Sequence, residues 1–133
     1  MRIVFLDTVG LIGLWDKSDQ WHTKASAAYE ALSQSPFIAV TTPLVLYECA
    51  NAASRRPYRK LLLDLRSRLS AENLVIPPSE DELAEAWTQY SSERYGTASL
   101  VDITSFIVMR RLGITEAFTN DQHFKAAGLI TLF

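Results

Sequence analysis

Residues 3–8 read Ile-Val-Phe-Leu-Asp-Thr, and this stretch decides how the rest of the chain is interpreted. Four consecutive apolar residues predict a short strand, within residues 2–7, that is buried on both faces of a sheet. Asp7 closes the run, although acidic residues are almost never placed in apolar segments without a partner. This carboxylate is therefore the first candidate for a functional residue.

Three further carboxylates share this unusual setting. Glu48 lies in the apolar run 44–50, Asp102 follows Leu100 and Val101, and Asp121 comes directly after residues 117–120. None of these runs contains a Lys or Arg that would pair with the acid. Acids gathered at one point can instead share a hard divalent cation, which prefers oxygen ligands. The four acids together therefore indicate a metal-dependent enzyme.

Size and composition indicate a single domain spanning residues 1–133. Hydrophobic residues make up 48% of the chain, which is enough for a core and too many for disorder. No apolar run approaches the roughly 20 residues that span a bilayer, and Asp7 interrupts the first run too early for a signal peptide. The single cysteine, Cys49, excludes an internal disulfide, so we expect a cytoplasmic protein that does not contact a membrane.

The charge distribution leaves two interpretations open. The formal net charge of −2 argues against a nucleic-acid partner, but setting the four unusual acids aside leaves a small basic excess. Much of the basic charge falls in one stretch, which contains Arg55, Arg56, Arg59, Lys60, Arg66 and Arg68. This stretch is either a solvated helix face or an RNA-binding surface. The RNA-binding residues would be Arg55, Arg56, Arg59 and Arg66.

Strand and helix signals alternate along the chain. We expect strands at residues 2–7, 37–41, 73–76, 116–119 and 129–133. We expect helices at residues 8–15, 18–33, 42–55, 57–71, 79–96, 99–111 and 121–127. Mostly apolar strands that alternate with helices predict an α/β/α sandwich with a mostly parallel sheet of about five strands.

This fold would bring the four acids to one edge of the sheet. Ligands of such sheets bind beyond the carboxyl ends of the strands, where the winding reverses. Asp7 and Asp121 both follow strands at that edge. Glu48 lies near the start of the helix after the second strand, and Asp102 lies in the first turn of a helix, where backbone N–H groups favour an anion.

Taken in order, these positions resemble the PIN-domain ribonucleases, in particular the small VapC-type toxins of bacterial toxin–antitoxin pairs. The matching pieces are Asp7-Thr8, Tyr47-Glu48 with Asn51, Ser99-Leu100-Val101-Asp102, Thr119-Asn120-Asp121 followed by His123-Phe124, and Gly128-Leu129-Ile130. Each piece alone is a weak signal. Their order and spacing across a chain of family length make the resemblance fairly specific.

The resemblance implies a PIN-like fold and a Mg²⁺- or Mn²⁺-dependent endoribonuclease that is usually a homodimer. It also implies a toxin that acts on RNA and is controlled by a small antitoxin protein. The acidic residues of the family map onto Asp7, Glu48, Asp102 and Asp121. Its supporting polar positions match Thr8, Asn51, Ser99 and Thr119.

Hydrolysis of a phosphodiester needs a nucleophile, charge neutralisation and a stabilised leaving oxygen, all of which bound metal can supply. We assign Asp7 as the central ligand, with Asp102 and Asp121 completing the first site. Glu48 either binds metal, directly or through water, or orients the attacking water. His123 is interpreted as an exposed residue on a short helix rather than as a catalytic base.

Simpler interpretations exist for three of the acids and for the whole chain. Asp102 alone would serve as a helix cap, Asp121 as the start of a turn or helix, and Asp7 as a strand-end turn residue. The sequence lacks the residues that a receiver domain or a haloacid-dehalogenase-type phosphatase requires. The remaining alternatives are a catalytically inactive PIN-like binding module and a housekeeping nuclease that is not a toxin.

Overall fold

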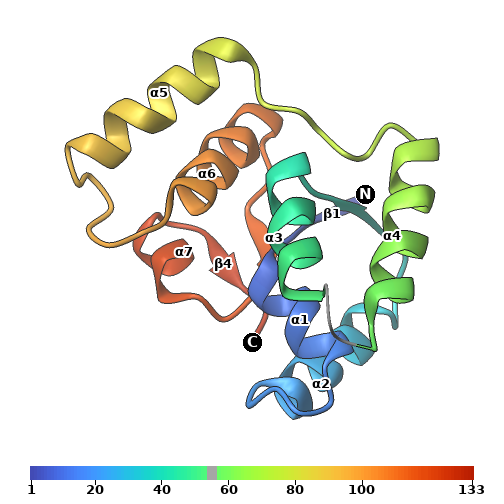
Figure 1. Cartoon of the computed structure of the whole chain (residues 1–133). Coiled ribbons are helices and arrows are strands. Elements are labelled where there is room, and N and C mark those ends of the chain that lie inside the picture. Colours follow the sequence, from blue (N-terminus) through green and yellow to red (C-terminus); the bar gives the residue numbers. More distant parts are fainter. Residues whose placement is uncertain (54–56) are drawn as a thin grey trace.

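The computed structural model describes residues 1–53 and 57–133, in which seven helices surround a four-stranded sheet (Figure 1). The elements in chain order are β1 (Arg2–Leu6), α1 (Thr8–Trp15), α2 (His22–Leu32), β2 (Phe37–Val40), α3 (Pro43–Ala53), α4 (Arg59–Ala71), α5 (Glu80–Ser91), α6 (Leu100–Leu112), β3 (Glu116–Phe118), α7 (Gln122–Ala126) and β4 (Ile130–Thr131). This is the α/β architecture that the alternating pattern predicts. None of the helices in the described ranges is long and apolar enough to cross a bilayer.

The sheet is parallel throughout, with the strand order β2-β1-β3-β4. Phe5 of β1 pairs with Val40 on one side and with Ala117 on the other. The chain first moves from β1 to β2 and later enters β3 on the opposite side of β1. The winding therefore reverses between β1 and β3, and a crevice at the carboxyl ends of these two strands is where such folds bind ligands.

The first two helices cover one face of the sheet. Leu6 and Phe118 are register partners and share that face. The ring of Tyr29 in α2 packs edge-on against Phe118, with 6.0 Å between centroids, and Gly10 in α1 lies directly against the Phe118 backbone. A right-handed crossover from β2 to β3 puts α3 and α6 on the opposite face, the face of Phe5. The helix α4 instead lines one pocket with Leu6, Phe37 and Phe118. One hydrophobic core joins side chains from β1 through α7.

Local capping signals predicted several helix ends correctly. Ser79 and Glu82 form a capping box at the start of α5, and Ser99 and Asp102 form another at the start of α6. In each box the Ser hydroxyl accepts from a backbone N–H and the acid side chain accepts from the Ser backbone. Gly113 ends α6 in the left-handed conformation, with φ of 68°, which a residue without Cβ adopts readily.

Some boundaries differ from those expected. The expected strand at residues 73–76 pairs with the sheet through only one parallel bridge, Thr41 to Val75, because Asn73 has φ of 57° and Pro77 and Pro78 have no N–H donor. The predicted helix at residues 18–33 begins only at His22. Side chains in the preceding turns explain this late start, since Asp16 accepts from the Ser18 backbone and Asp19 from the Trp21 backbone.

Other expected ends also shift, and the helix expected at residues 79–96 ends at Ser91. The helix expected at residues 57–71 begins at Arg59, and the last strand is shortened to Ile130–Thr131. The helix that starts at Pro43 is described as far as Ala53. Its expected end at Arg55 lies outside the described residues.

Candidate metal centre

Asp7 lies at the switch point of the sheet. It is the first residue after β1 and the N-cap of α1, and only 1% of its surface is exposed. Its Oδ2 accepts a hydrogen bond of 2.8 Å from the hydroxyl of Thr119, which follows β3. This buried bond ties the carboxyl ends of β1 and β3 together.

Thr119 also positions Asp121. The Thr119 hydroxyl oxygen accepts from the backbone N–H of Asp121 at 3.1 Å, while its proton is donated to Asp7. Asp121 is the N-cap of α7, and its Oδ1 accepts from the backbone N–H of His123 at 2.9 Å. One threonine therefore fixes the positions of two of the four acids relative to each other.

Asp102 lies in the first turn of α6, close enough for its charge to act on Asp7. The backbone N–H of Ser99 donates to its Oδ2 at 3.3 Å, and Ser99 Oγ accepts from the Asp102 backbone at 3.0 Å. Asp102 is thus a helix-capping residue, as the simpler interpretation of this acid predicted. It is also half-buried and close enough to Asp121 for the two charges to interact.

Glu48 comes from α3 and is held by the residue after Asp7. The Thr8 hydroxyl donates to Glu48 Oε1 at 2.6 Å, and Glu48 is half-buried. Asn51, three residues further along α3, is exposed. The structure therefore brings Thr8, Ser99 and Thr119 into contact with the acids, whereas the side chain of Asn51 makes no hydrogen bond within residues 1–53 and 57–133.

Burial and neighbouring acids raise the pKa of two of the acids, Asp7 and Asp102. Burial, followed by the charges of Asp102 and Asp121, raises the pKa of Asp7 to about 7. Burial and the charges of Asp121 and Glu48 raise the pKa of Asp102 to about 6. The buried Cys49 thiol beside this cluster has its pKa raised to about 12, by burial first and then by the charge of Asp7. This agrees with the expected core position of Cys49 and excludes a thiolate nucleophile there.

These residues fit a divalent cation. Within the described part of the chain, no Lys or Arg forms an ion pair with any of the four acids. One ligand atom each from Asp102, Asp121 and His123 lies within 4.8 Å of the other two, and this compact group contains neither Asp7 nor Glu48. Like charges that lie close together at a partly buried site without a cationic side chain are the arrangement that a hard metal ion stabilises.

Residues 4–129 match the family model for the PIN domain. The chain belongs to the PIN domain family. It is 30% identical over 129 residues to the 23S rRNA-specific endonuclease VapC20 of Mycobacterium tuberculosis, an alignment that covers 96% of each chain.

Solved structures give the same family relationship. The crystal structure of Mycobacterium tuberculosis VapC20, titled a Sarcin-Ricin loop cleaving toxin, superposes with a TM-score of 0.78 at 26% identity and 96% coverage of both chains. FitAB bound to an IR36 DNA fragment matches with a TM-score of 0.65 at 14% identity, over 96% of this chain and 92% of the other. FitAcB from Neisseria gonorrhoeae matches with a TM-score of 0.61 at 15% identity, over 96% of this chain and 95% of the other. The last two similarities concern the fold alone.

In this PIN domain, His123 is part of the acidic cluster rather than an exposed helix residue. It is half-buried, with Nδ1 lying 2.9 Å from Asp121 Oδ1 and Nε2 lying 3.0 Å from Thr97 Oγ1. The expected exposed position is therefore wrong. The sequence does contain a signal for the contact between His123 and Asp121. The two residues are two positions apart, and an N-cap side chain reaches the residues just after it. No sequence signal pointed to Thr97.

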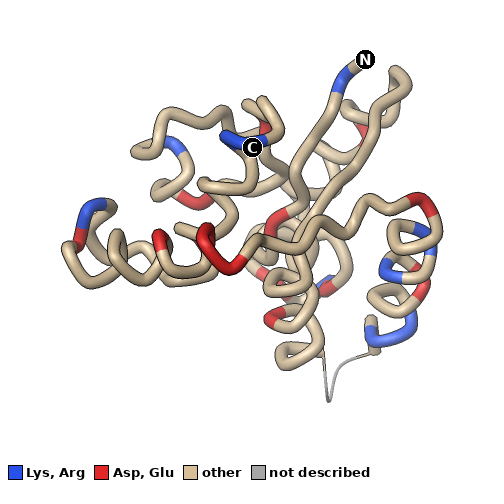
Figure 2. The backbone as a smooth tube through the Cα atoms, turned by 90° about the horizontal axis from the view of Figure 1, so that it is seen from above, with Lys and Arg blue, Asp and Glu red and all other residues tan. Residues whose placement is uncertain are grey.

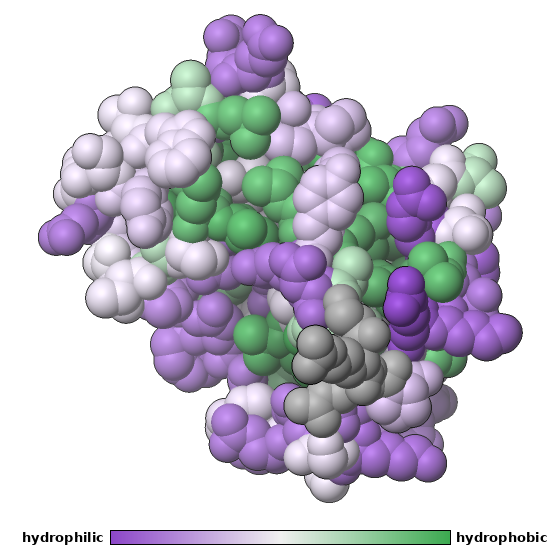
Figure 3. Space-filling model, in the orientation of Figure 1, coloured by the Kyte–Doolittle hydropathy of each residue, from purple (hydrophilic) through white to green (hydrophobic). Residues whose placement is uncertain are grey.

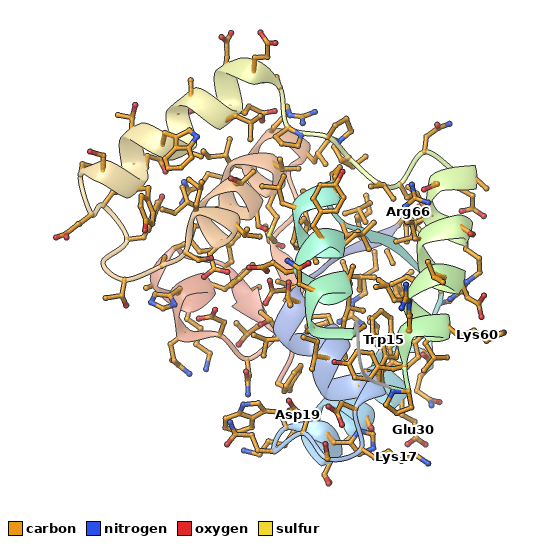
Figure 4. All side chains as sticks on the ribbon, in the orientation of Figure 1. Trp15, Lys17, Asp19, Glu30, Lys60 and Arg66 are labelled. Atoms are coloured by element: carbon orange, nitrogen blue, oxygen red, sulfur yellow. The ribbon has the colours of Figure 1, made fainter. Side chains whose placement is uncertain are left out.

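The basic stretch lies apart from the acids. Arg59 and Arg66 are exposed on α4, and α4 lies on the other side of α3 from α6 and α7 (Figures 1 and 2). Figure 4 shows Lys60 on the same helix, pointing away from the body of the protein. Arg55 and Arg56 lie outside the described residues. An RNA-binding role for this stretch would require a substrate that extends past α3.

Proposed function

We propose that this PIN domain is an endoribonuclease that uses Mg²⁺ or Mn²⁺ and is the toxin of a type II toxin–antitoxin pair. One observation carries the proposal: the carboxylate of Asp7 is buried at the switch point of the sheet, beside two other acids that raise its pKa. A protein gains nothing in stability from such a cluster, so its retention supports a role in holding a cation.

The roles of the residues follow from their surroundings. When bound, a divalent cation supplies a nucleophilic water near neutral pH and positive charge against the phosphate. We assign Asp7 as the central ligand because it is the most buried acid and interacts with both Asp102 and Asp121. Thr119 orients Asp7 by donating to it, and Ser99 orients Asp102. Glu48, held by Thr8, is placed to orient the attacking water.

The RNA substrate and the toxin role are supported by the relatives. VapC20 is named for its action on 23S rRNA, and it resembles this chain over nearly its whole length. The presence of all four acids argues against an inactive binding module. We propose a cytoplasmic location and a small antitoxin protein as the partner, in keeping with the toxin role.

The proposal is tested by metal dependence. The purified protein should cut RNA in Mg²⁺ or Mn²⁺, stop when EDTA is added, and resume when excess Mn²⁺ is returned. Cleavage that continues in EDTA would contradict the metal requirement. A folded protein that binds RNA but never cuts it in either metal would support the inactive module instead.

The basic stretch gives a separate prediction. If Arg59 and Arg66 each contact a phosphate, changing both to alanine should weaken RNA binding and flatten its salt dependence. The slope of log K against log salt should become smaller by about 1.4, since each phosphate contact to a single strand contributes about 0.7. Fluorescence anisotropy with labelled RNA at several salt concentrations measures this slope. A Lys17→Ala variant, which lies outside the stretch, is the control, and an unchanged slope in the double variant rules the stretch out.

Self-association of this PIN domain is also a prediction. Tyr47 on α3 and Trp87 on α5 are 69% and 59% exposed, and apolar side chains reach the surface over α5, α6 and α3 (Figure 3). Large exposed aromatic residues are typical of protein interfaces. We expect the mass from light scattering to be that of two chains at micromolar concentration. Changing Tyr47 and Trp87 to serine should shift it to one chain, and a native protein that stays monomeric would contradict the homodimer.

A further inference from the structure

Both ring nitrogens of His123 are engaged, and they connect two different parts of the metal centre. Nδ1 lies 2.9 Å from Asp121 Oδ1, and Nε2 lies 3.0 Å from Thr97 Oγ1. Thr97 belongs to the segment between α5 and α6, two residues before Ser99. The imidazole therefore joins the start of α7, where Asp121 is the N-cap, to the segment that leads into the Ser99–Asp102 capping box.

The partners of the ring determine where its protons lie. An ionised carboxylate oxygen only accepts, so Nδ1 carries a proton and donates it to Asp121 Oδ1. Nε2 and the Thr97 hydroxyl form the second hydrogen bond, in which the protonation of the ring decides which of the two groups donates. Asp121 Oδ1 also accepts from the His123 backbone at 2.9 Å. Two donors on Oδ1 fix the plane of the carboxylate, while Oδ2 accepts no hydrogen bond from the described ranges.

We infer that His123 is a positioning residue, which holds Asp121 through Nδ1 and, through Nε2 and Thr97, keeps Asp121 and Asp102 at the separation that one cation requires. This inference rests on the proposed function and deepens it. The compact arrangement of the three side chains, with ligand atoms within 4.8 Å, is what the imidazole maintains. Partners that orient a ligand commonly affect metal affinity as strongly as some ligands do.

Direct ligation by His123 is the less suitable role. Both of its nitrogens already have hydrogen-bond partners, so coordination would break one of these bonds. Mg²⁺ takes oxygen ligands, and imidazole suits zinc, copper, iron and nickel better than it suits magnesium or manganese. A histidine that donates to a carboxylate ligand from behind keeps the oxygen character of the site.

The inference is tested by titrating metal-free protein with Mn²⁺ in a calorimeter. His123→Leu removes both bonds and should raise the Kd for Mn²⁺ by about 10- to 100-fold. His123→Asn keeps a donor near the position of Nδ1 and should recover most of the affinity. His22→Leu is the matched control. His22 is also half-buried, but its Nδ1 lies 2.8 Å from the Gly13 carbonyl, so the Kd should be unchanged.

Each outcome separates the possibilities. If His123→Leu binds Mn²⁺ as tightly as the native protein, the positioning role is wrong. If His123→Asn is as weak as His123→Leu, donation to Asp121 is not what matters, and the inference is again overturned. Should circular dichroism show that His123→Leu is unfolded, His123→Gln and Thr97→Val replace it. Both should then weaken binding, His123→Gln more strongly, and native-like affinity in both would equally overturn the inference.

Failure of the proposed function has a different signature. A native protein that neither binds Mn²⁺ nor cuts RNA removes the metal-dependent nuclease itself, and the positioning role falls with it. A native protein that binds and cuts, together with unaltered binding by His123→Leu, overturns the positioning role alone.

Discussion

Asp7→Asn should lower RNA cleavage by about a thousandfold or more while leaving the protein folded. When several residues act together in catalysis, removing one of them lowers the rate by this factor or more. Asparagine is as good an N-cap as aspartate, and its side-chain oxygen can still accept from Thr119, so α1 and the β1–β3 contact should persist. The measurement is single-turnover cleavage in Mn²⁺. Expression of the native chain in a bacterium should also slow growth, whereas the variant should not.

The stability of the native protein should depend on pH through Asp7, and this dependence should be missing in Asp7→Asn. The folded pKa of Asp7 is about 7, above the ordinary value of 3.8, so the metal-free native state keeps a proton that the unfolded chain has released. Stability should therefore fall as pH rises from about 4 to 7, by about 4 kcal/mol at most.

Comparing the two proteins isolates this effect. Asp102, with a pKa of about 6, adds a slope of the same sign at lower pH. Because Asp102 is present in both proteins, the native protein and Asp7→Asn should differ in slope by the contribution of Asp7 alone, across about pH 5 to 7, which urea unfolding in EDTA measures. Equal slopes there, or rapid cleavage by a folded Asp7→Asn protein, would contradict the role given to Asp7.

Gly10→Ala should be the most destabilising single substitution among the glycines of the described helices. A Cβ at this position would lie 2.0 Å from the carbonyl oxygen of Phe118 and 2.6 Å from its Cδ2. A backbone atom in a central strand cannot move aside, so α1 would have to shift away from β3. We expect a loss of about 3 kcal/mol or more in the free energy of unfolding, at the upper end of overpacking effects. Activity should fall as well, since Asp7 begins the same helix.

Gly13→Ala is the matched comparison on the same helix. Its Cβ would lie 3.1 Å from the Ala25 Cβ, a side-chain contact that needs a shift of only a few tenths of an ångström. The helix propensity of alanine, about 1 kcal/mol better than that of glycine, offsets this crowding. Urea unfolding should therefore place Gly13→Ala within about 1 kcal/mol of the native protein. Similar stabilities for the two variants would show that α1 does not lie against β3 as closely as described.

Local patterns predicted much of this architecture because they act over a few residues. The apolar run before Asp7, the capping box at Ser99 and the glycine at position 113 each specify an element from within it. The parallel arrangement then follows from the alternation of elements, and it brings Asp7 and Asp121 to one edge.

Contacts between distant segments had no such local signal. The threonine at position 119 was matched as a supporting residue, but its double contact with Asp7 and Asp121 depends on β1 and β3 being neighbours. The pairing of His123 with Thr97 depends on how a loop packs over α7. Likewise, helical periodicity put Arg59 and Arg66 on one helix but carried no information about where that helix lies relative to the acids.

Three of the four acids occupy the amino ends of helices: Asp7 begins α1, Asp102 lies in the first turn of α6 and Asp121 begins α7. Each carboxylate therefore accepts a hydrogen bond from a backbone N–H at the start of a helix, in addition to its role in the proposed chemistry. Alanine substitutions at these positions would lower activity in two ways, by removing a carboxylate and by unwinding the start of a helix. Asparagine, which caps a helix without a charge, offers a way to make an inert version of the whole protein for capturing a substrate or partner intact.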